Sequence, residues 1–300
     1  MTVRLRASAL NWHDVLVREG RYGSPLPHVI GADGAGIVHG TGDEVMIVPS
    51  LRWGERSAAP GDGWQILGDH IPGTYAELVQ VPAECVAPKP TGWSWAEAAA
   101  FPLVGLTTYR ALFTRARLSA GESLLVLGAG GGVSTCAVTL GAAASADVVV
   151  TSSSDQKIAA ARGLGARDGV RYSDPDWVSA ARSLSPGGRG FDVVLDSVGT
   201  WPDSIRALRP GGRLVVLGAA RATQAQLDVR SFYFGQYDLL GTTMGSNQDF
   251  VDLLAFMGSH DVAAPAIDRV FPLDQAAAAH EYLEGGRGFG KVVLDVGGTL

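Results

Sequence analysis

The stretch SLLVLGAGGGVSTC, residues 123–136, carries the strongest structural signal in this sequence. Residues 123–127 are mostly apolar and stand between Gly-Glu and a glycine, which is typical of a strand buried in a parallel sheet. A glycine cluster follows at once, and residues 133–140 favour a helix. This order predicts a pyrophosphate site, because the free N–H groups and the dipole at a helix N-terminus favour negative charge.

A glycine cluster alone also fits a loop that merely needs positive φ, so its surroundings decide the interpretation. From residue 123 onward strands and helices alternate, which predicts a doubly wound parallel sheet. The expected strands are 123–128, 147–151, 169–172, 191–196, 212–218 and 237–243. The expected helices are 131–142, 155–163, 174–184, 201–207, 248–258 and 274–284. A final strand at 290–296 lies far along the chain and is a candidate to return to the first domain.

The residues before 93 have a different pattern, with short strands and many glycines. Residues 3–8 alternate as an outer strand does, and residues 29–38 are predicted to form a glycine-broken strand pair. Short strands are also expected at 44–49, 75–81 and 85–89, and together these segments indicate a small β-barrel. The long loop 51–74 is rich in Gly, Pro and charge, and residues 93–113 favour helix.

Composition excludes several classes of function. The 300 residues carry a net charge of −6, and Lys and Arg are scattered, so no basic surface for nucleic acid or an anionic membrane is expected. The two cysteines, Cys85 and Cys136, form neither a CxxC pair nor a disulfide framework. No signal peptide or membrane-spanning run is recognised. We therefore expect a cytoplasmic α/β protein with a small-molecule substrate.

Several ordered motifs resemble the medium-chain dehydrogenase/reductase superfamily, in its zinc-free, quinone-oxidoreductase-like branch. The matching segments are ASALNWHD, HVIGADGAGIV, FPLVGLTTYRAL, VLGAGGGVS, DVVLDSVG and FGKVVL, and two further segments resemble bacterial "zinc-type alcohol dehydrogenase-like" members. The resemblance implies a GroES-like catalytic domain over 1–92 and 264–300 and a Rossmann NADP-binding domain over 93–263. It also implies a homodimer that joins the edge strands around 237–243.

One departure from the family concerns the start of the chain. Family members carry several barrel strands ahead of the segment that begins here at Thr2. A shortened barrel would expose a strand edge and apolar surface. We therefore expect lower stability or stronger self-association than in a relative that has those strands.

The resemblance also indicates that no zinc is bound. The positions that match the catalytic zinc ligands of zinc-dependent relatives are Asn11, Ala32-Asp33 and Val104, and only Asp33 has a ligating side chain for zinc. The loop 51–74 holds no cysteine, so the four thiolates of a structural zinc site are missing. The remaining conceivable ligands fit no standard spacing for a zinc site; they are His13, Asp14, His28, Asp33, His39 and His70.

The second strand of the cofactor domain indicates which dinucleotide is bound. It ends in Thr-Ser-Ser-Ser (151–154), with no carboxylate at the tip and Lys157 just beyond. Hydroxyls and an ammonium suit the 2′-phosphate of NADPH, whereas an acid at this tip would favour NADH. Asp155 is the complication, and we interpret it as a first-turn or N-cap residue. A capped loop without a cofactor role is the alternative for the serines.

The resemblance implies the remaining site residues. It places the catalytic Asn11 and Thr107 at the nicotinamide end, and Trp12 and Tyr22 give a flat apolar wall for substrate, although core packing explains these aromatics equally well. The predicted cofactor-binding residues are Gly128, Gly130, Gly131, Gly132, Val133, Ser152, Ser153, Lys157, Tyr172, Gly218, Ala219, Met244, Gly245 and Lys291.

Three functions remain open at the level of sequence. The first is a zinc-independent, NADPH-dependent reductase that transfers hydride to a quinone, an enone or a related carbonyl compound. The second is a zinc-type alcohol dehydrogenase, which the missing ligands disfavour. The third is a non-catalytic NADPH-binding or redox-sensing protein.

Overall fold

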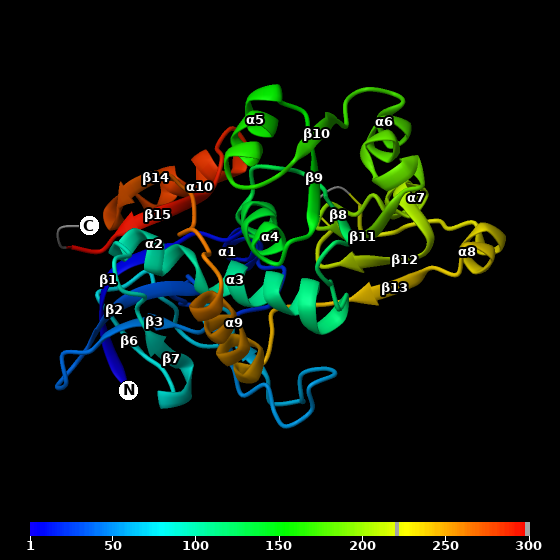
Figure 1. The fold of residues 1–300 in the computed structure, drawn as a ribbon. Helices are drawn as coiled ribbons and strands as arrows, with labels where there is room; N and C mark the ends of the chain where they lie inside the picture. Colours follow the sequence, from blue (N-terminus) through cyan, green and yellow to red (C-terminus); the bar gives the residue numbers. More distant parts are fainter. Residues whose placement is uncertain (220–221, 298–300) are drawn as a thin grey trace. The chain divides into compact units, whose positions relative to one another are not determined.

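The computed structural model describes residues 1–219 and 222–297, and the chain divides into two compact units (Figure 1). The first unit comprises Met1–Leu106, Met244–Leu253 and Ala264–Leu300, and the second comprises Thr107–Thr243 and Leu254–Ala263. The expected domains placed residues 93–106 and 244–253 in the cofactor domain, whereas these segments group with the first unit. Residues 93–106 group with the first unit because helix α2 (Trp95–Ala100) packs on strands of that unit.

The second unit is built on a six-stranded sheet in the order β10-β9-β8-β11-β12-β13, and every neighbouring pair is parallel. Its strands are β8 (Ser123–Val126), β9 (Asp147–Ser152), β10 (Asp168–Arg171), β11 (Phe191–Asp196), β12 (Leu208–Val216) and β13 (Asp238–Gly241). The chain starts in the middle of the sheet, runs to one edge and returns to build the other half. This confirms the doubly wound Rossmann arrangement.

Alternate residues of the central strands face opposite layers of helices. Leu125 and Val149 pack in one core cluster with side chains of α6 and α7, whereas Leu124 and Val148 lie beneath Gly141 of α4. Both faces of the sheet are therefore covered, which explains why its strands are continuously apolar. The helices of this unit are α4 (Gly132–Ala143), α5 (Asp155–Gly163), α6 (Trp177–Leu184), α7 (Trp201–Ala207) and α8 (Val229–Gly235).

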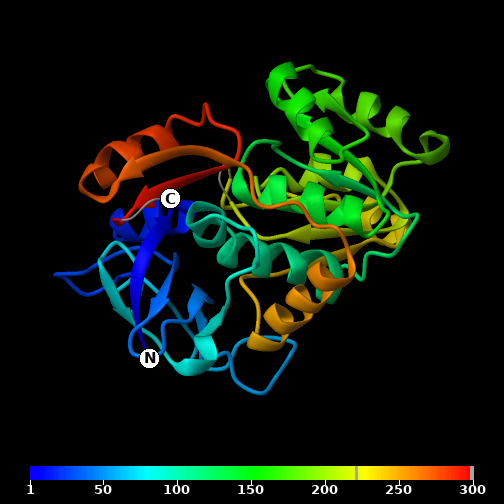
Figure 2. The same cartoon turned by 60° about the vertical axis from the view of Figure 1, so that its left-hand side comes forward.

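The first unit has a seven-stranded sheet in the order β14-β15-β1-β2-β3-β7, with β6 also paired to β1. Its strands are β1 (Thr2–Ala9), β2 (Asp33–Val38), β3 (Glu44–Ile47), β6 (Leu78–Gln80), β7 (Val86–Pro88), β14 (Ile267–Pro272) and β15 (Lys291–Asp295). The last strand pairs antiparallel with the first, so the expected return of the chain is confirmed (Figure 2). Two short strands, β4 (Ser50–Leu51) and β5 (Gln65–Ile66), pair within the long loop.

The helices of the first unit are α1 (Trp12–Arg18), α2, α9 (Asn247–Ser259) and α10 (Ala276–Glu284), with the end of α9 in the second unit. Helix α3 (Pro102–Tyr109) crosses from the first unit into the second and continues as a π-helical turn over Arg110–Arg115. Among the described residues, no helix is long and apolar enough to cross a membrane.

The expected strand pair at 29–38 is wrong in its first half. Strand β2 begins at Asp33, and the residues before it bond to a loop instead of a sheet neighbour. Gly73 N donates to Val29 O at 2.7 Å, and Thr74 N donates to Gly31 O at 2.9 Å. A Cβ on Gly31 would lie 2.3 Å from the ring of Tyr75, so this glycine permits the close approach of two loops.

Candidate functional site

The predicted pyrophosphate turn has the backbone that its glycines suggest. It follows β8, with Gly128 at φ 75° and Gly130 at φ 122°, and Gly131 is the N-cap of α4. Both positive φ values lie in the region that glycine tolerates best. Thr151 of β9 fixes the turn, because its carbonyl oxygen accepts from Ala129 N at 2.7 Å and its hydroxyl accepts from Gly128 N at 3.1 Å. The free N–H groups of the α4 N-terminus therefore follow directly after a rigid turn.

Two residues of α4 fix how the helix follows the turn and packs on the sheet. Ser134 is buried, and its hydroxyl donates to Gly131 O at 2.9 Å. The serine is therefore accommodated by an internal hydrogen bond. Close helix–sheet packing occurs about two turns further along the helix, at Gly141, where a Cβ would lie 3.0 Å from Leu124 Cδ2 and from Val148 Cγ2.

The tip of β9 holds the predicted phosphate-binding residues. Ser152 is buried, and its hydroxyl accepts from Ser154 N at 3.2 Å, whereas Ser153 is exposed. Ser154 is the N-cap of α5, and its hydroxyl accepts from Lys157 N at 3.4 Å. Tyr172 N donates to Ser152 O at 3.0 Å, which places Tyr172 beside this tip. The structure thus brings Ser152, Ser153, Lys157 and Tyr172 together at the carboxyl ends of β9 and β10.

The loop after β11 is organised by a residue that sequence reasoning missed. The carboxylate of Asp196 is fully buried and accepts from the N–H groups of Val198, Gly199 and Thr200 at 2.7, 2.8 and 3.0 Å. It also accepts from Ser204 Oγ at 2.8 Å. An aspartate directly after the three apolar strand residues Val193, Val194 and Leu195 is the signal that would have identified it.

Gly218, predicted at the cofactor, packs against this loop. A Cβ on Gly218 would lie 2.5 Å from Ser197 O, so only a glycine allows the backbone after β12 to lie so close. Ala219 follows and is exposed. Its Cα is 3.5 Å from the position that a Cβ on Gly199 would take. Asp196 therefore sets the shape of the backbone next to both predicted residues.

In the first unit, Asn11 lies in a buried polar cluster at the end of β1. Its Oδ1 accepts from Lys291 Nζ at 2.5 Å, and its Nδ2 donates to Asp33 Oδ2 at 2.9 Å and to Ala9 O at 3.4 Å. Both amide hydrogens are therefore engaged, while Oδ1 has one further acceptor position. Asn11, Asp33 and Lys291 are all at least 94% buried, since their exposed fractions are 6, 0 and 4%.

Asp33 connects this cluster to α3. Lys291 Nζ lies 3.1 Å from Asp33 Oδ2, and Leu103 N at the start of α3 donates to Asp33 Oδ1 at 2.8 Å. An ammonium and an amide therefore occupy the carboxylate that resemblance matches to a zinc-site position. These residues do not fit a zinc ion, which needs deprotonated Cys, His or carboxylate ligands in tetrahedral array. Among the described residues, no three His, Cys, Asp or Glu side chains are grouped to hold a metal.

A second buried carboxylate, Asp14, lies beside Asn11. Its two oxygens accept from Asn11 N at 2.8 Å and Ala32 N at 3.1 Å. Burial raises the pKa of Asp14 to about 7, and the neighbouring Asp33 charge adds to this, although the two N–H donors oppose it. Tyr75, whose hydroxyl is 3.2 Å from His280 Nε2, has a pKa raised well above its ordinary value by burial and by Asp14. Tyr75 therefore stays protonated.

The predicted substrate-wall residues lie on and after α1. Trp12 and Tyr22 are 48% and 46% exposed, so neither is a core residue of the first unit. The ring of Tyr22 lies 4.7 Å from that of His13, centroid to centroid. Burial lowers the pKa of His13, and Asp69 opposes this effect. The role of both aromatics at a substrate stays a prediction.

The predicted nicotinamide wall at Met244 and Gly245 begins the second segment of the first unit. Met244 is buried and has φ 39°, an unfavourable value for a side chain with a Cβ. Ser246 follows, and its backbone N and hydroxyl donate to Asp249 Oδ2 at 2.8 and 2.7 Å. Strain held in place by a capped helix is a recurrent feature of functional sites. Thr107, the other predicted catalytic residue, is buried in α3 and belongs to the second unit.

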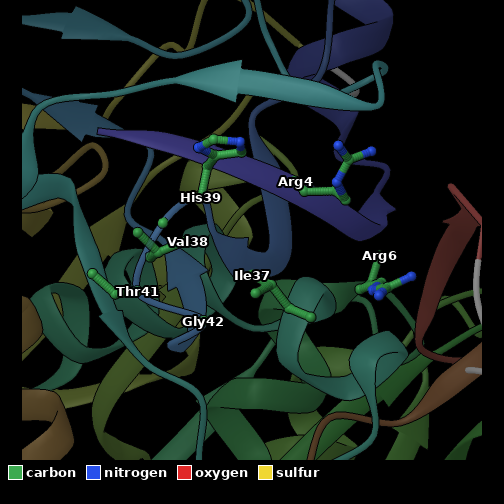
Figure 3. Close-up of a pocket in the computed structure, with 8 residues that line it drawn as sticks. Arg4, Arg6, Ile37, Val38, His39, Thr41 and Gly42 are labelled. Atoms are coloured by element: carbon green, nitrogen blue, oxygen red, sulfur yellow. The ribbon is translucent and has the colours of Figure 1, made fainter.

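A shallow hollow of about 420 Å³ lies on the outer face of the first unit's sheet (Figure 3). Arg4 and Arg6, two positions apart on β1, lie on the same side of the strand as Ile37 of β2. None of the predicted site residues lines this hollow. The candidate residues therefore form two separate groups, the glycine turn with the strand tips within the second unit and the Asn11 cluster within the first.

Comparison with known proteins gives matches along most of the chain. The family model of the alcohol dehydrogenase GroES-like domain matches residues 1–91, and that of the zinc-binding dehydrogenase matches residues 132–259. A zinc-type alcohol dehydrogenase-like protein of Schizosaccharomyces pombe is 33% identical, over 98% of this chain and 90% of its own length. A quinone oxidoreductase of Pseudomonas aeruginosa is 33% identical, over 97% and 90%. A crystal structure titled as an NAD-dependent alcohol dehydrogenase has a TM-score of 0.92 at 39% identity and covers 99% of this chain and 91% of its own.

Proposed function

Since the chain belongs to the medium-chain dehydrogenase/reductase superfamily of oxidoreductases, we propose that it is a zinc-independent reductase of quinones, enones or related carbonyl compounds that uses NADPH. The observation that carries the proposal is the ion pair between Lys291 and Asp33, which takes up the carboxylate that a zinc site would require. NADPH supplies the hydride when it is bound.

The glycine turn of the second unit supports nicotinamide dinucleotide binding. Its two positive-φ glycines and the α4 N-terminus suit a pyrophosphate, which the N–H groups of Gly131, Gly132 and Val133 would hold. Ser153, Lys157 and Tyr172 would bind the 2′-phosphate at the strand tips. Gly218, Ala219, Met244 and Gly245 are proposed to line the nicotinamide end of the cofactor.

The hydrogen bonds of Asn11 define what its side chain can do. With both N–H groups donated to Asp33 and Ala9, Asn11 would accept a hydrogen bond from a hydroxyl of the cofactor ribose or of the substrate. It would not polarise a carbonyl oxygen. Lys291, proposed from the family as a cofactor contact, holds Asn11 in this orientation. Thr107 is the other proposed hydroxyl at the reacting end.

The test is steady-state oxidation of NADPH with a panel of quinones and enones, with and without a chelator. We expect turnover with at least one acceptor and no loss of rate after chelation. Absence of turnover with every acceptor would instead support an NADPH-binding protein without catalysis. Oxidation of ethanol or benzyl alcohol that requires added zinc would support the second candidate, an alcohol dehydrogenase, which the names of two relatives favour.

We also propose that two copies associate through the edge strand β13 of the second unit. It is the last strand in its sheet, so among the described residues it has a neighbouring strand on one side only, although Arg115 Nε donates to Gly241 O on the open side at 3.0 Å. Beside it in sequence, α8 exposes Val229, Tyr233 and Phe234 at 73, 57 and 66%. Exposed aromatic side chains next to an open sheet edge are typical of an interface.

A further inference from the structure

An ion pair at the cofactor end of the second unit involves a cation that the proposed function does not use. Arg171 is the last residue of β10 and lies opposite Ser152 of β9 in the strand register. Its Nη1 is 3.3 Å from Asp155 Oδ2, and its Nε donates to Ser173 Oγ at 3.4 Å. Asp155 is the first residue of α5, directly after the Ser152–Ser154 tip. The pair therefore lies among the residues proposed to bind the 2′-phosphate.

Asp155 is the residue that argues against NADPH at this tip. A carboxylate there repels a phosphate that carries nearly two negative charges, whereas it would accept hydrogen bonds from the two ribose hydroxyls of NADH. In the structure this carboxylate is paired with Arg171, so the local negative charge is neutralised. Lys157, two residues further along α5, adds a second positive charge.

We propose that Arg171 determines the cofactor choice of this protein, because it holds the Asp155 carboxylate in an ion pair until the 2′-phosphate of NADPH replaces the carboxylate on the guanidinium. The replacement is physically reasonable. The side chains of Arg171 and Asp155 are 45 and 74% exposed and joined through one nitrogen, which makes a weak pair. A phosphate offers three acceptor oxygens to the guanidinium fork and binds it more strongly.

The same two elements provide a matched control. Arg162 in the last turn of α5 pairs with Asp168 at the other end of β10. This pair also joins an exposed arginine to an aspartate, but it lies at the amino end of the strand, away from the Ser152 tip. Loss of Arg162 should therefore reproduce any general effect on stability or net charge without an effect on phosphate recognition.

The experiment measures binding of 2′,5′-ADP and of 5′-AMP to the full chain by calorimetry, for the wild type, Arg171→Gln, Asp155→Asn and Arg162→Gln. Arg171→Gln should weaken 2′,5′-ADP binding about tenfold or more and change 5′-AMP binding less than about twofold. Asp155→Asn should strengthen 2′,5′-ADP binding roughly threefold. Arg162→Gln should leave the ratio of the two affinities unchanged.

This inference rests on the proposed NADPH preference, and the experiment separates the two. A wild type that binds 2′,5′-ADP no more tightly than 5′-AMP overturns the NADPH preference itself. A wild type that prefers 2′,5′-ADP, with Arg171→Gln indistinguishable from Arg162→Gln, overturns the role of Arg171 alone. The gain expected for Asp155→Asn cannot arise from misfolding, so weaker or unchanged 2′,5′-ADP binding in that variant also counts against the proposal.

Discussion

The amide of Asn11 is held on its oxygen by Lys291 and on its nitrogen by Asp33. A lysine and an aspartate removed from water are costly unless they pair, and loss of one partner leaves an uncompensated charge. Here the pair also fixes the direction in which Asn11 can bond. The three residues come from positions 11, 33 and 291, so folding alone brings them together.

We predict that Lys291→Met lowers the free energy of unfolding by about 3–5 kcal/mol, because it leaves the buried Asp33 carboxylate without its cationic partner. Arg206→Met is the control, since Arg206 pairs at 3.0 Å with Asp203 and both side chains are exposed, at 66 and 41%, so its loss should cost no more than about 1 kcal/mol. Urea denaturation of both variants measures the difference. Equal losses of unfolding free energy in the two variants would show that the buried ion pair contributes no more to stability than the exposed one.

At the scale of the element, the strand–turn–helix unit from β8 to α4 depends on backbone conformation more than on side-chain space. At Gly128 a Cβ would meet only Val198 Cγ2, at 3.4 Å, which is ordinary contact. Its φ of 75° is the property that requires glycine. Gly218, by contrast, is required by space, because its φ is ordinary and its neighbour is a carbonyl oxygen.

Gly128→Ala should therefore destabilise the chain by about 1–2 kcal/mol, since an alanine in the left-handed region is strained. It should also weaken NADPH binding, because relief of that strain moves the turn. Gly163→Ala in α5 is the matched control: this glycine has open space around it and helical φ, so its replacement should raise stability by about 0.5–1 kcal/mol. Thermal unfolding and NADPH fluorescence test both, and an unchanged affinity for NADPH in Gly128→Ala would contradict the first expectation.

At the scale of the whole molecule, buried acids make stability depend on pH. The pKa of Asp14 is raised from 3.8 to about 7 in the folded state. A raised pKa favours the folded state fully below pH 3.8, and this contribution is lost as pH rises to about 7. The pKa values of His13 and His280 are lowered by burial, and they act in the opposite direction.

Comparison of the wild type with Asp14→Asn isolates the acid, because both proteins keep the two histidines. We expect the unfolding free energy of Asp14→Asn, relative to the wild type, to rise by about 4 kcal/mol between pH 4 and 7 and then to level off. The variant also loses one acceptor for Asn11 N or Ala32 N, which shifts the whole curve but not its slope. Parallel curves in urea titrations across this range would contradict the raised pKa.

The association of two copies is tested by charge on α8. Phe234→Glu should convert a dimer into a monomer in analytical ultracentrifugation, because it replaces an exposed aromatic side chain of the proposed interface with a charge that is costly to bury. Val251→Glu, at an exposed apolar position on α9 of the first unit, should leave the dimer intact. A wild type that is monomeric, or a Phe234→Glu variant that stays dimeric, would refute the interface.

Much of this protein follows from local patterns in the sequence. The βα alternation predicted the doubly wound sheet and the place of the glycine turn, because strand periodicity and glycine clusters act over a few residues. The strand segments before residue 93 were also largely correct, and the first half of 29–38 failed because Gly31 allows a loop contact that no periodicity records. Family resemblance supplied the expected site residues.

Only the tertiary structure decided which charges meet. Nothing near Asp33 in the sequence indicates that Lys291 neutralises it, and Asp155 is neutralised by Arg171 from the next strand of the sheet. The role of Asp196 likewise depends on a loop that closes over its carboxylate. The physical reason is that helix and strand preferences are local, whereas the partner of a charge depends on how distant segments pack. The sequence by itself therefore determined the sheet and the glycine turn, and packing decided the ion pairs that define the chemistry of the site.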